Sequence, residues 1–387
     1  MVIWMAFAVL LWGRLAQDAV PYQVAGALVR TQPHEVYASS SGDLFDLAKP
    51  FADRWCEIAP PGTNCEKLNV AYVSMPLALP LSVVFAATGN QFGVLLARLL
   101  AAGALVAGMC MLWKRLAGVD PNAPRYVVIA AALLTPMAAV PITLGQTSPY
   151  LFLLACVGVT VTDRSRQRWF VALLWAVTIS LKLFPAVLGL VLIRQRQFRL
   201  LLMTFVAIAA LAVATVVLAP LSIWADFMHM SANVTRHAVD NPYSGSIDRI
   251  AHQVWVPLTE NPVASTLLIL ARLMLAGGLW WWGVRDADDD TQWAYGSLVV
   301  MLIVPLVWWH YLWVGIAALG IALARRTVNR RWLIALPIAA ALTVPVSLAN
   351  AFGHAWPLVQ ELVLIGFVIL VPIVVRSSID RVSTNEL

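Results

Sequence analysis

The stretch RLLLMTFVAIAALAVATVVLAPL (199–221) decides the fold class of this chain. After Arg199 it carries no charge, and its only polar side chains are threonines. A helix needs about 20 apolar residues to cross the hydrocarbon core of a bilayer, whereas the strands of an outer-membrane barrel are segments of about ten residues with alternating hydrophobicity. The stretch therefore predicts a membrane-crossing α-helix.

The composition extends this prediction to the whole chain. Of its 387 residues, 61% are hydrophobic and 12% are charged, against about 25% charged in soluble domains. We expect an all-α polytopic membrane protein with about 11–13 transmembrane helices, organised as a single integral membrane domain over residues 1–387. The expected helices cover residues 1–16, 69–88, 91–113, 126–144, 148–162, 199–221, 263–284, 292–309, 311–324, 332–349 and 357–375.

The segment 169–193 needs a different arrangement because basic residues flank it on both sides. Arg164–Arg168 precede it and Arg194–Arg199 follow it, so a single crossing would place one basic cluster outside. Two crossings would leave about a dozen residues each, or about 18 Å of helix. We predict a pair of short helices, broken near Lys182 and Pro185, that dips into the membrane and returns. Broken helices are tolerated at membrane depth where they line a cavity.

The distribution of positive charge predicts the orientation of the chain. Lysines and arginines gather in short loops, which the positive-inside rule assigns to the cytoplasm. Loops 17–68 and 222–262 are then external, on the outer side of a plasma membrane. Lys114 and Arg115 conflict with this orientation if 69–88 and 91–113 both cross. Either one of these segments is re-entrant or the rule fails locally, and the sequence leaves this open.

Loop 17–68 is predicted to be ordered. Apolar residues recur at helical spacing over 20–28, which predicts an amphipathic helix at the membrane surface. Cys56 and Cys65 flank a Pro-Gly turn in the same loop, and two nearby cysteines in an oxidising compartment favour a disulfide. Two unpaired thiols are the alternative. A metal site is disfavoured because His34 is the only further nitrogen ligand that the loop offers.

Several segments, taken in order, are similar to one enzyme family. They are Asp18 after the first apolar run, Leu144-Gly145-Gln146, Leu181-Lys182-Leu183-Phe184-Pro185, a polar loop that ends at Arg249, and Pro305–His310. In this order they resemble glycosyltransferase family 87. That resemblance implies a GT-C fold and the transfer of mannose or arabinofuranose from a polyprenyl-phosphate sugar. Where the family often has Tyr-Pro-Pro, this chain has Tyr72-Val73-Ser74-Met75-Pro76.

The resemblance and the chemistry of these side chains together suggest catalytic roles. Transfer from a lipid-phosphate sugar needs a base that takes the proton of the acceptor hydroxyl, and Asp18 is expected to be that base. Charge grows on the polyprenyl phosphate as its bond to the sugar breaks. Lys182, with His310 or Arg249 as a helper, is expected to stabilise that charge.

Substrate binding is also expected at Gln146, Tyr22 and Tyr72. Because fixed cations can balance the phosphate charge, no metal is needed. No cofactor is expected other than the lipid-linked sugar, which is itself the substrate.

Each of these roles has a structural alternative. Asp18 could cap the helix that follows it, and Lys182 could extend its ammonium group to a lipid head group. His310 could belong to an interfacial aromatic belt, and Gln146 could satisfy backbone groups at its turn. The acidic run Asp286–Asp290 is expected to be a solvated turn on the cytoplasmic side.

We therefore expect an inverting membrane glycosyltransferase, active at the external membrane face, that transfers mannose to a cell-envelope glycolipid or polysaccharide. Arabinofuranosyl transfer from polyprenyl-phosphate-arabinose is the alternative within the same class. A transporter or flippase is the alternative from a different class, but transporters usually contain paired broken helices in repeated halves, and one broken segment is found here. The expected partners are the donor, the acceptor and membrane lipid, without nucleic acid.

Overall fold

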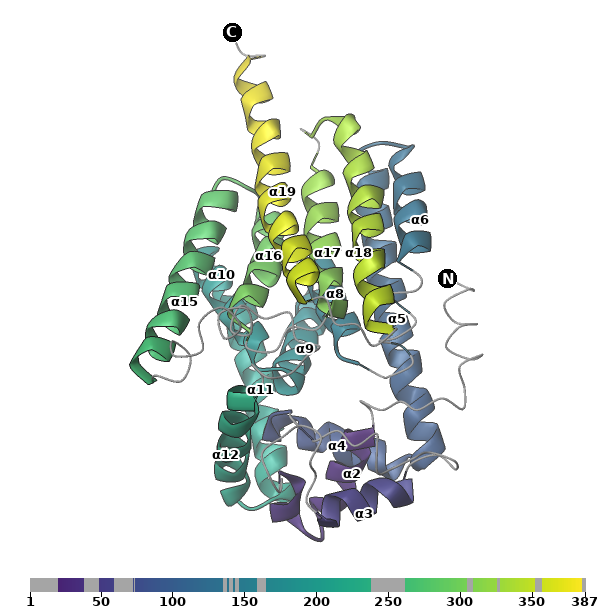
Figure 1. Ribbon diagram of the computed structural model, residues 1–387, viewed down its shortest axis with the longest axis vertical. Coiled ribbons are helices and arrows are strands. Elements are labelled where there is room, and N and C mark those ends of the chain that lie inside the picture. The colour runs from purple at the N-terminus through teal and green to yellow at the C-terminus, as the bar shows by residue number, and fades with distance from the viewer. Residues whose placement is uncertain are drawn as a thin grey trace.

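The computed structural model describes residues 20–37, 49–58, 72, 74–134, 138, 142, 146–158, 165–237, 262–304, 309–325, 328–351 and 357–384. These residues are 86% helical and contain no strand, so the predicted all-α class is confirmed. Figure 1 shows two parts, a bundle of long helices and a smaller group of short helices at one end of it.

Four stretches of the bundle are long and apolar enough to cross a membrane, and they lie in α5 (Asn90–Ala117), α11 (Phe198–Leu218), α15 (Pro262–Val284) and α19 (Pro357–Thr384). Shorter helices pack among them. These are α6 (Ala123–Leu133), α8 (Ser148–Val157), α16 (Asp289–Val299) continued by the 3-10 turn η6 (Val300–Ile303), α17 (Leu312–Leu323) and α18 (Ala335–Ala351), the last preceded by η8 (Arg330–Ile334).

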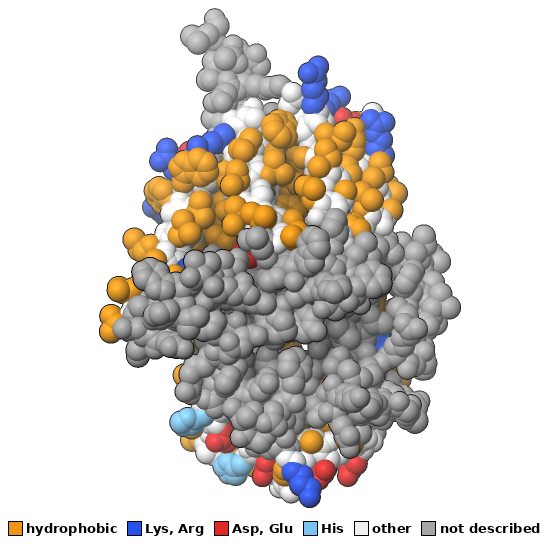
Figure 2. Space-filling view, viewed as in Figure 1, with side chains coloured by type: hydrophobic (Ala, Val, Ile, Leu, Met, Phe, Trp, Pro, Cys, Tyr) orange, Lys and Arg blue, Asp and Glu red, His pale blue; other side chains and the backbone are white. Residues whose placement is uncertain are grey.

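The outer surface of the bundle is apolar, as a lipid-facing surface must be. On α11, for example, Phe205 is 66% exposed and Val217 is 80% exposed. Figure 2 shows hydrophobic side chains covering this part of the molecule, with Lys and Arg gathered at the end away from the small group of helices. We call this the basic end. Its charge and the apolar belt beside it agree with a membrane protein oriented by the positive-inside rule.

The pair of short helices predicted within 169–193 is confirmed. α9 (Ser165–Leu181) stops at Lys182, and the chain continues through the 3-10 turn η4 (Phe184–Leu188) into α10 (Gly189–Arg194). Pro185 explains the break, because its ring excludes the carbonyl of the residue four positions earlier in a continuous helix. The Trp175 indole of α9 donates a hydrogen bond to the Pro185 carbonyl (2.8 Å), which holds the two helices together at the break.

The open question about residues 69–113 is resolved by helix length. The expected helix over 69–88 appears as the 3-10 turn η2 (Pro76–Ala78) and the short α4 (Leu79–Ala87). The twelve residues of η2 and α4 span about 18 Å, which is short for a membrane crossing and favours the re-entrant alternative over a second crossing helix. α5 alone crosses, and it brings Lys114 and Arg115 to the basic end.

The group of short helices, which we call the small lobe, consists of α2 (Val20–Leu28), η1 (Pro33–Val36), α3 (Lys49–Ile58), α4 and α12 (Ser222–His237). α2 confirms the helix predicted over 20–28 but not its amphipathic character, and its position at a membrane surface stays a prediction. It is buried on most sides and packs on α4, where a Cβ at Gly26 would come within 2.0 Å of the Ser82 carbonyl oxygen. Only glycine permits this close approach.

Two helices of the small lobe were not predicted. α3 is the amphipathic helix of the first loop, because Phe51, Trp55 and Ile58 are buried while its charged residues face outward. α12 occupies the first part of the predicted loop 222–262. Its apolar residues Ile223, Phe227 and Met230 are buried at helical spacing.

The prediction that Asp286–Asp290 form a solvated turn is wrong for Asp290, which is buried, while Asp288 is exposed but has structural partners. Asp288 caps α16 by accepting from the Thr291 backbone N–H (2.9 Å), and it also pairs with Arg325 (3.2 Å). Asp290 is 3% exposed and pairs with Arg115. A cap and two arginines from other helices therefore hold this segment against the bundle.

Candidate functional site

Lys182 lies directly after the last residue of α9, at the helix break. Its backbone N–H still donates to the Thr178 carbonyl (2.9 Å), so the main chain at Lys182 is fixed as a final helical turn. The side chain is half-buried. A lysine at such a position presents a cation where apolar packing ends, as the sequence predicted.

The structure brings His310 close to Lys182. His310 is 2% exposed and belongs to the 3-10 turn η7 (Trp309–Tyr311), which precedes α17. The charge of Lys182 is near enough to act on the imidazole. Next to His310, the Tyr311 ring lies 5.9 Å from the ring of Phe184, measured between centroids. The break after α9 and the turn before α17 therefore form one neighbourhood, although 128 positions separate the two residues in the numbering.

Hydrogen bonds from the small lobe hold the end of α9. The Ser74 hydroxyl donates to the Leu181 carbonyl (3.0 Å), and the Met75 backbone N–H donates to the Ser180 carbonyl (3.2 Å). Two tyrosines in turn hold Ser74. Tyr37 donates to its carbonyl (2.8 Å), and the hydroxyl groups of Tyr22 and Ser74 lie 2.8 Å apart. Tyr22, a predicted substrate-binding residue, is thus linked to the residue just before Lys182.

Tyr72 lies in the core of the small lobe. It is 2% exposed, its ring contacts those of Tyr22 and Tyr37 at centroid distances of 5.4 and 5.5 Å, and its hydroxyl oxygen accepts a bond from Ser82 (3.2 Å). Burial raises the pKa of both Tyr37 and Tyr72 well above the usual value. Both phenols therefore stay protonated at ordinary pH and keep their hydrogen bonds. The structure gives Tyr72 a packing role, and its contact with substrate stays a prediction.

Gln146 stands just before α8 and is half-buried. Its side-chain carbonyl oxygen is shielded from solvent, and no group among the described residues donates a hydrogen bond to it. The alternative that this oxygen satisfies a backbone N–H at the turn finds no support in the described part of the chain. A role in binding substrate stays a prediction.

Other predicted site residues lie outside the described residues. They are Asp18, Arg249 and Cys65, so neither the proposed base, the second cation nor the Cys56–Cys65 disulfide is tested. His34 of the same loop makes a contact of 3.2 Å with Asp226 of α12. Within the described ranges, no three side chains of the His, Cys, Asp and Glu types gather as a metal site.

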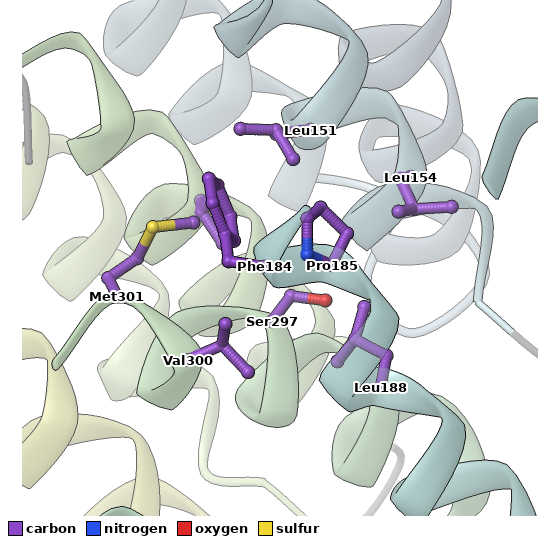
Figure 3. Close-up of a pocket in the computed structure, with 9 residues that line it drawn as sticks. Leu151, Leu154, Phe184, Pro185, Leu188, Ser297, Val300 and Met301 are labelled. Atoms are coloured by element: carbon purple, nitrogen blue, oxygen red, sulfur yellow. The ribbon is translucent and has the colours of Figure 1, made fainter. Parts of the chain in front are cut away.

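The break is backed by tightly packed apolar side chains. Behind it lies a cavity of about 10 Å³, room for about one water molecule. Figure 3 shows Phe184 and Pro185 of η4 on one side of the cavity, with side chains from α8 and from α16 and η6 around it. The one polar side chain in its lining, Ser297, bonds its own helix at the Trp293 carbonyl (3.0 Å). This packing fixes η4 and so fixes the direction in which the chain leaves Lys182.

Sequence reasoning missed three residues near this neighbourhood. The roles of Tyr37 and Ser74 depend on contacts between distant segments, which no local pattern reveals. Glu361 of α19 was also missed, although a lone acid inside an apolar helix is a recognisable signal of function in membrane proteins.

Comparison with known proteins gives one finding. The family model described as Glycosyltransferase family 87 matches residues 72–307, which is more than half of the chain. The match includes Tyr72, Gln146, Lys182 and Arg249 and ends just before His310. No curated protein and no solved structure matches the chain.

Proposed function

Because the chain belongs to glycosyltransferase family 87 and is a membrane glycosyltransferase, we propose that it transfers mannose from polyprenyl-phosphate-mannose to a cell-envelope glycolipid or polysaccharide. The observation that carries this proposal is the half-buried Lys182 at the helix break, beside the buried His310. A membrane-embedded cation next to a second nitrogen base suits a phosphate group whose lipid tail remains in the bilayer.

The proposed reaction is a direct displacement at the anomeric carbon, in a fold of the GT-C type. A bond forms between the acceptor oxygen and the anomeric carbon while the bond from that carbon to the phosphate oxygen breaks. The configuration of the sugar is inverted, and polyprenyl phosphate leaves with the electron pair. Asp18 takes the proton of the acceptor hydroxyl as the new bond forms.

Lys182 would stabilise the leaving phosphate by placing a fixed positive charge beside it. Such a charge acts strongly where water is excluded and the group needs no reorganisation during the reaction. His310 and Arg249 would supply further hydrogen bonds to the same phosphate. Because side chains balance its charge, the proposed mechanism uses no metal and no cofactor other than the lipid-linked donor.

The orientation supports transfer at the external face of the plasma membrane. The Lys182 break lies toward the small lobe, whereas the arginines gather at the other end of the bundle, the side that the positive-inside rule assigns to the cytoplasm. An acceptor that reaches the small lobe would approach from outside. Gln146 and Tyr22 are proposed to contact the sugar there, and Tyr72 to support them.

Sugar transfer in isolated membranes tests the proposal. Membranes that contain the chain receive radiolabelled polyprenyl-phosphate-mannose or polyprenyl-phosphate-arabinose together with a native lipid extract, and the wild type is compared with Asp18→Asn. We expect label from the mannose donor to enter a glycolipid only with the wild type. Label from the arabinose donor alone would assign a pentosyltransferase instead.

Two results would contradict the mechanism. Near-normal transfer by Asp18→Asn would show that another residue is the general base. Retention of configuration at the labelled carbon, determined from the linkage of the product, would exclude the direct displacement.

A further inference from the structure

A buried carboxyl group on α19 has no role in the mechanism above. Glu361 is 2% exposed, both of its side-chain oxygens are shielded from solvent, and neither accepts a hydrogen bond from the described residues. It lies on the face of α19 that is buried in the bundle together with Leu364 and Val368, whereas Leu362 and Ile365 are exposed on the lipid-facing side. The acid therefore points into the protein and not into the bilayer.

Two parallel helices show how deep Glu361 lies. α17 ends before Arg325, which pairs with Asp288, and α19 passes Arg376, which donates to the Trp282 carbonyl (2.7 Å). Both helices therefore run toward the basic end. Their contact fixes the register, because a Cβ at Gly315 would meet the Phe367 ring at 2.6 Å.

Six residues before this contact, α19 reaches Glu361, and the other segment has passed the start of α17 and reached Trp309 in η7, the turn that contains His310. Fifteen residues separate Glu361 from Arg376 at the basic end, or about 22 Å of helix. Glu361 thus lies inside the membrane part of the protein at the depth of the Lys182–His310 neighbourhood.

A carboxyl group in this position is costly for folding. An acid buried in an apolar environment without hydrogen-bond donors loses its hydration and gains nothing in return. Ionisable residues inside membrane helices are retained mainly where they serve a function. A bound ligand that donates hydrogen bonds would remove the cost.

We propose that Glu361 binds hydroxyl groups of the sugar, with sugar O–H groups donating to its two carboxyl oxygens at the depth of His310. This inference rests on the proposed function and deepens it, because it adds a sugar-recognising residue to a reaction in which Lys182 and His310 hold the phosphate. Vicinal hydroxyls suit a carboxylate, which has two acceptor oxygens in one plane. The sugar is that of the donor or that of the acceptor, and the experiment separates the two.

The test combines stability with ligand binding in the purified full-length protein. Glu361→Leu removes the costly acid and fills its space with an apolar side chain, so we expect a higher melting temperature without ligand. Gln360→Leu is the matched control, because Gln360 is equally buried and has an interaction within the protein. Its loss should lower the melting temperature.

Binding is measured with polyprenyl phosphate, polyprenyl-phosphate-mannose and octyl mannoside. Glu361→Leu should leave the affinity for polyprenyl phosphate unchanged and lower that for a mannose-bearing probe by about 10- to 100-fold, the effect of losing charge-assisted hydrogen bonds. An effect on the donor alone assigns Glu361 to the donor sugar, and an effect on octyl mannoside alone assigns it to the acceptor sugar. Glu361→Gln, which keeps one acceptor oxygen, should show a smaller loss and serves if the leucine variant fails to fold.

Two kinds of failure can be told apart. If the glutamate variants bind all three probes as the wild type does, or if Glu361→Leu melts at a lower temperature than the wild type, the role of Glu361 is overturned. If the wild type binds none of the probes, the proposed function itself fails, and the sugar-binding role fails with it.

Discussion

The two ends of the helix bundle treat buried charge in different ways. At the basic end, acids from one segment are matched with arginines from another, in the largely buried pair Arg115–Asp290 and in the pairs Arg325–Asp288 and Arg330–Asp120, each with one exposed partner. Toward the small lobe, Lys182 stands at a helix break and Glu361 on a buried face without a hydrogen-bond donor among the described residues. Matched pairs fix helices to one another, whereas the Glu361 carboxyl group accepts no hydrogen bond from the described residues. We propose that the first end keeps the bundle together and that the second acts on substrate.

The largest effect is expected from removing the charge at the break. Lys182→Ala should lower the rate of sugar transfer by about 100- to 1,000-fold, because the charge on the leaving phosphate loses its fixed partner. Donor binding should weaken while acceptor binding is unchanged, as measured by transfer kinetics with each substrate varied. An effect confined to acceptor binding would contradict the proposal that Lys182 binds the phosphate. It would also contradict the proposed difference in function between the two ends of the bundle.

Breaking an ion pair at the basic end should lower the free energy of unfolding and leave the rate of sugar transfer unchanged. Asp290→Ala leaves Arg115 partly buried without its acid, which should lower the free energy of unfolding by about 3 kcal/mol. Thermal unfolding in detergent measures this loss, with transfer assayed below the melting temperature. The control Asp286→Ala removes an acid that is 66% exposed and pairs only with its neighbour Arg285, so its effect should be within about 0.5 kcal/mol. Equal effects of the two variants would contradict a structural role for the buried pair.

High pH should destabilise the small lobe. The folded-state pKa values of Tyr37 and Tyr72 lie above the value of about 10 expected for an unfolded chain. Above pH 10 the unfolded state therefore loses protons that the folded state retains. Stability is fully present below pH 10 and decreases as the pH rises, by about 1.4 kcal/mol per pH unit for each tyrosine. Melting curves at pH 8 to 11 measure the slope, which Tyr72→Phe should reduce; an unchanged slope in that variant would exclude Tyr72 as the cause.

A smaller effect is expected where the small lobe holds the break. Ser74→Ala removes the hydrogen bond to the Leu181 carbonyl, which should cost about 1 kcal/mol and displace Lys182 slightly. We expect the KM for the donor to increase by a few-fold with little change in melting temperature. Ser231→Ala, a change in α12 away from the break, is the control. If Ser74→Ala lowers only the melting temperature, Ser74 supports the lobe without positioning Lys182.

The sequence predicted the features that depend on composition and local breaks. The apolar length of 199–221 predicted a crossing helix, and Pro185 together with the flanking arginines predicted the pair of short helices. Failures arose where contacts between distant segments decide the structure. The sequence predicts a solvated Asp290 because its partner Arg115 is far away along the chain. It predicts an amphipathic α2 because the packing partner α4 cannot be recognised from the local pattern.

The same reason limits the prediction of the site. Lys182 carries a local signal, because a lysine beside a helix-breaking proline in an apolar segment is unusual. The proximity of His310 to Lys182 has no local signal in the sequence, since it depends on how α9 and α17 pack. Tyr37 and Ser74 become relevant only through hydrogen bonds that join the small lobe to the end of α9.

The core of the small lobe joins residues that are synthesised far apart in time. Val20 and Phe51 come from the beginning of the chain, whereas Ile223 and Phe227 of α12 complete the same core. At about 5–20 residues per second, roughly 10–40 seconds of translation separate the two contributions. The apolar side chains of the early half that α12 covers therefore stay exposed while the first part of the bundle is inserted. Biogenesis of this protein should accordingly be sensitive to chaperones that protect the waiting half, and a chain truncated before α12 should be degraded quickly even if its membrane helices insert normally.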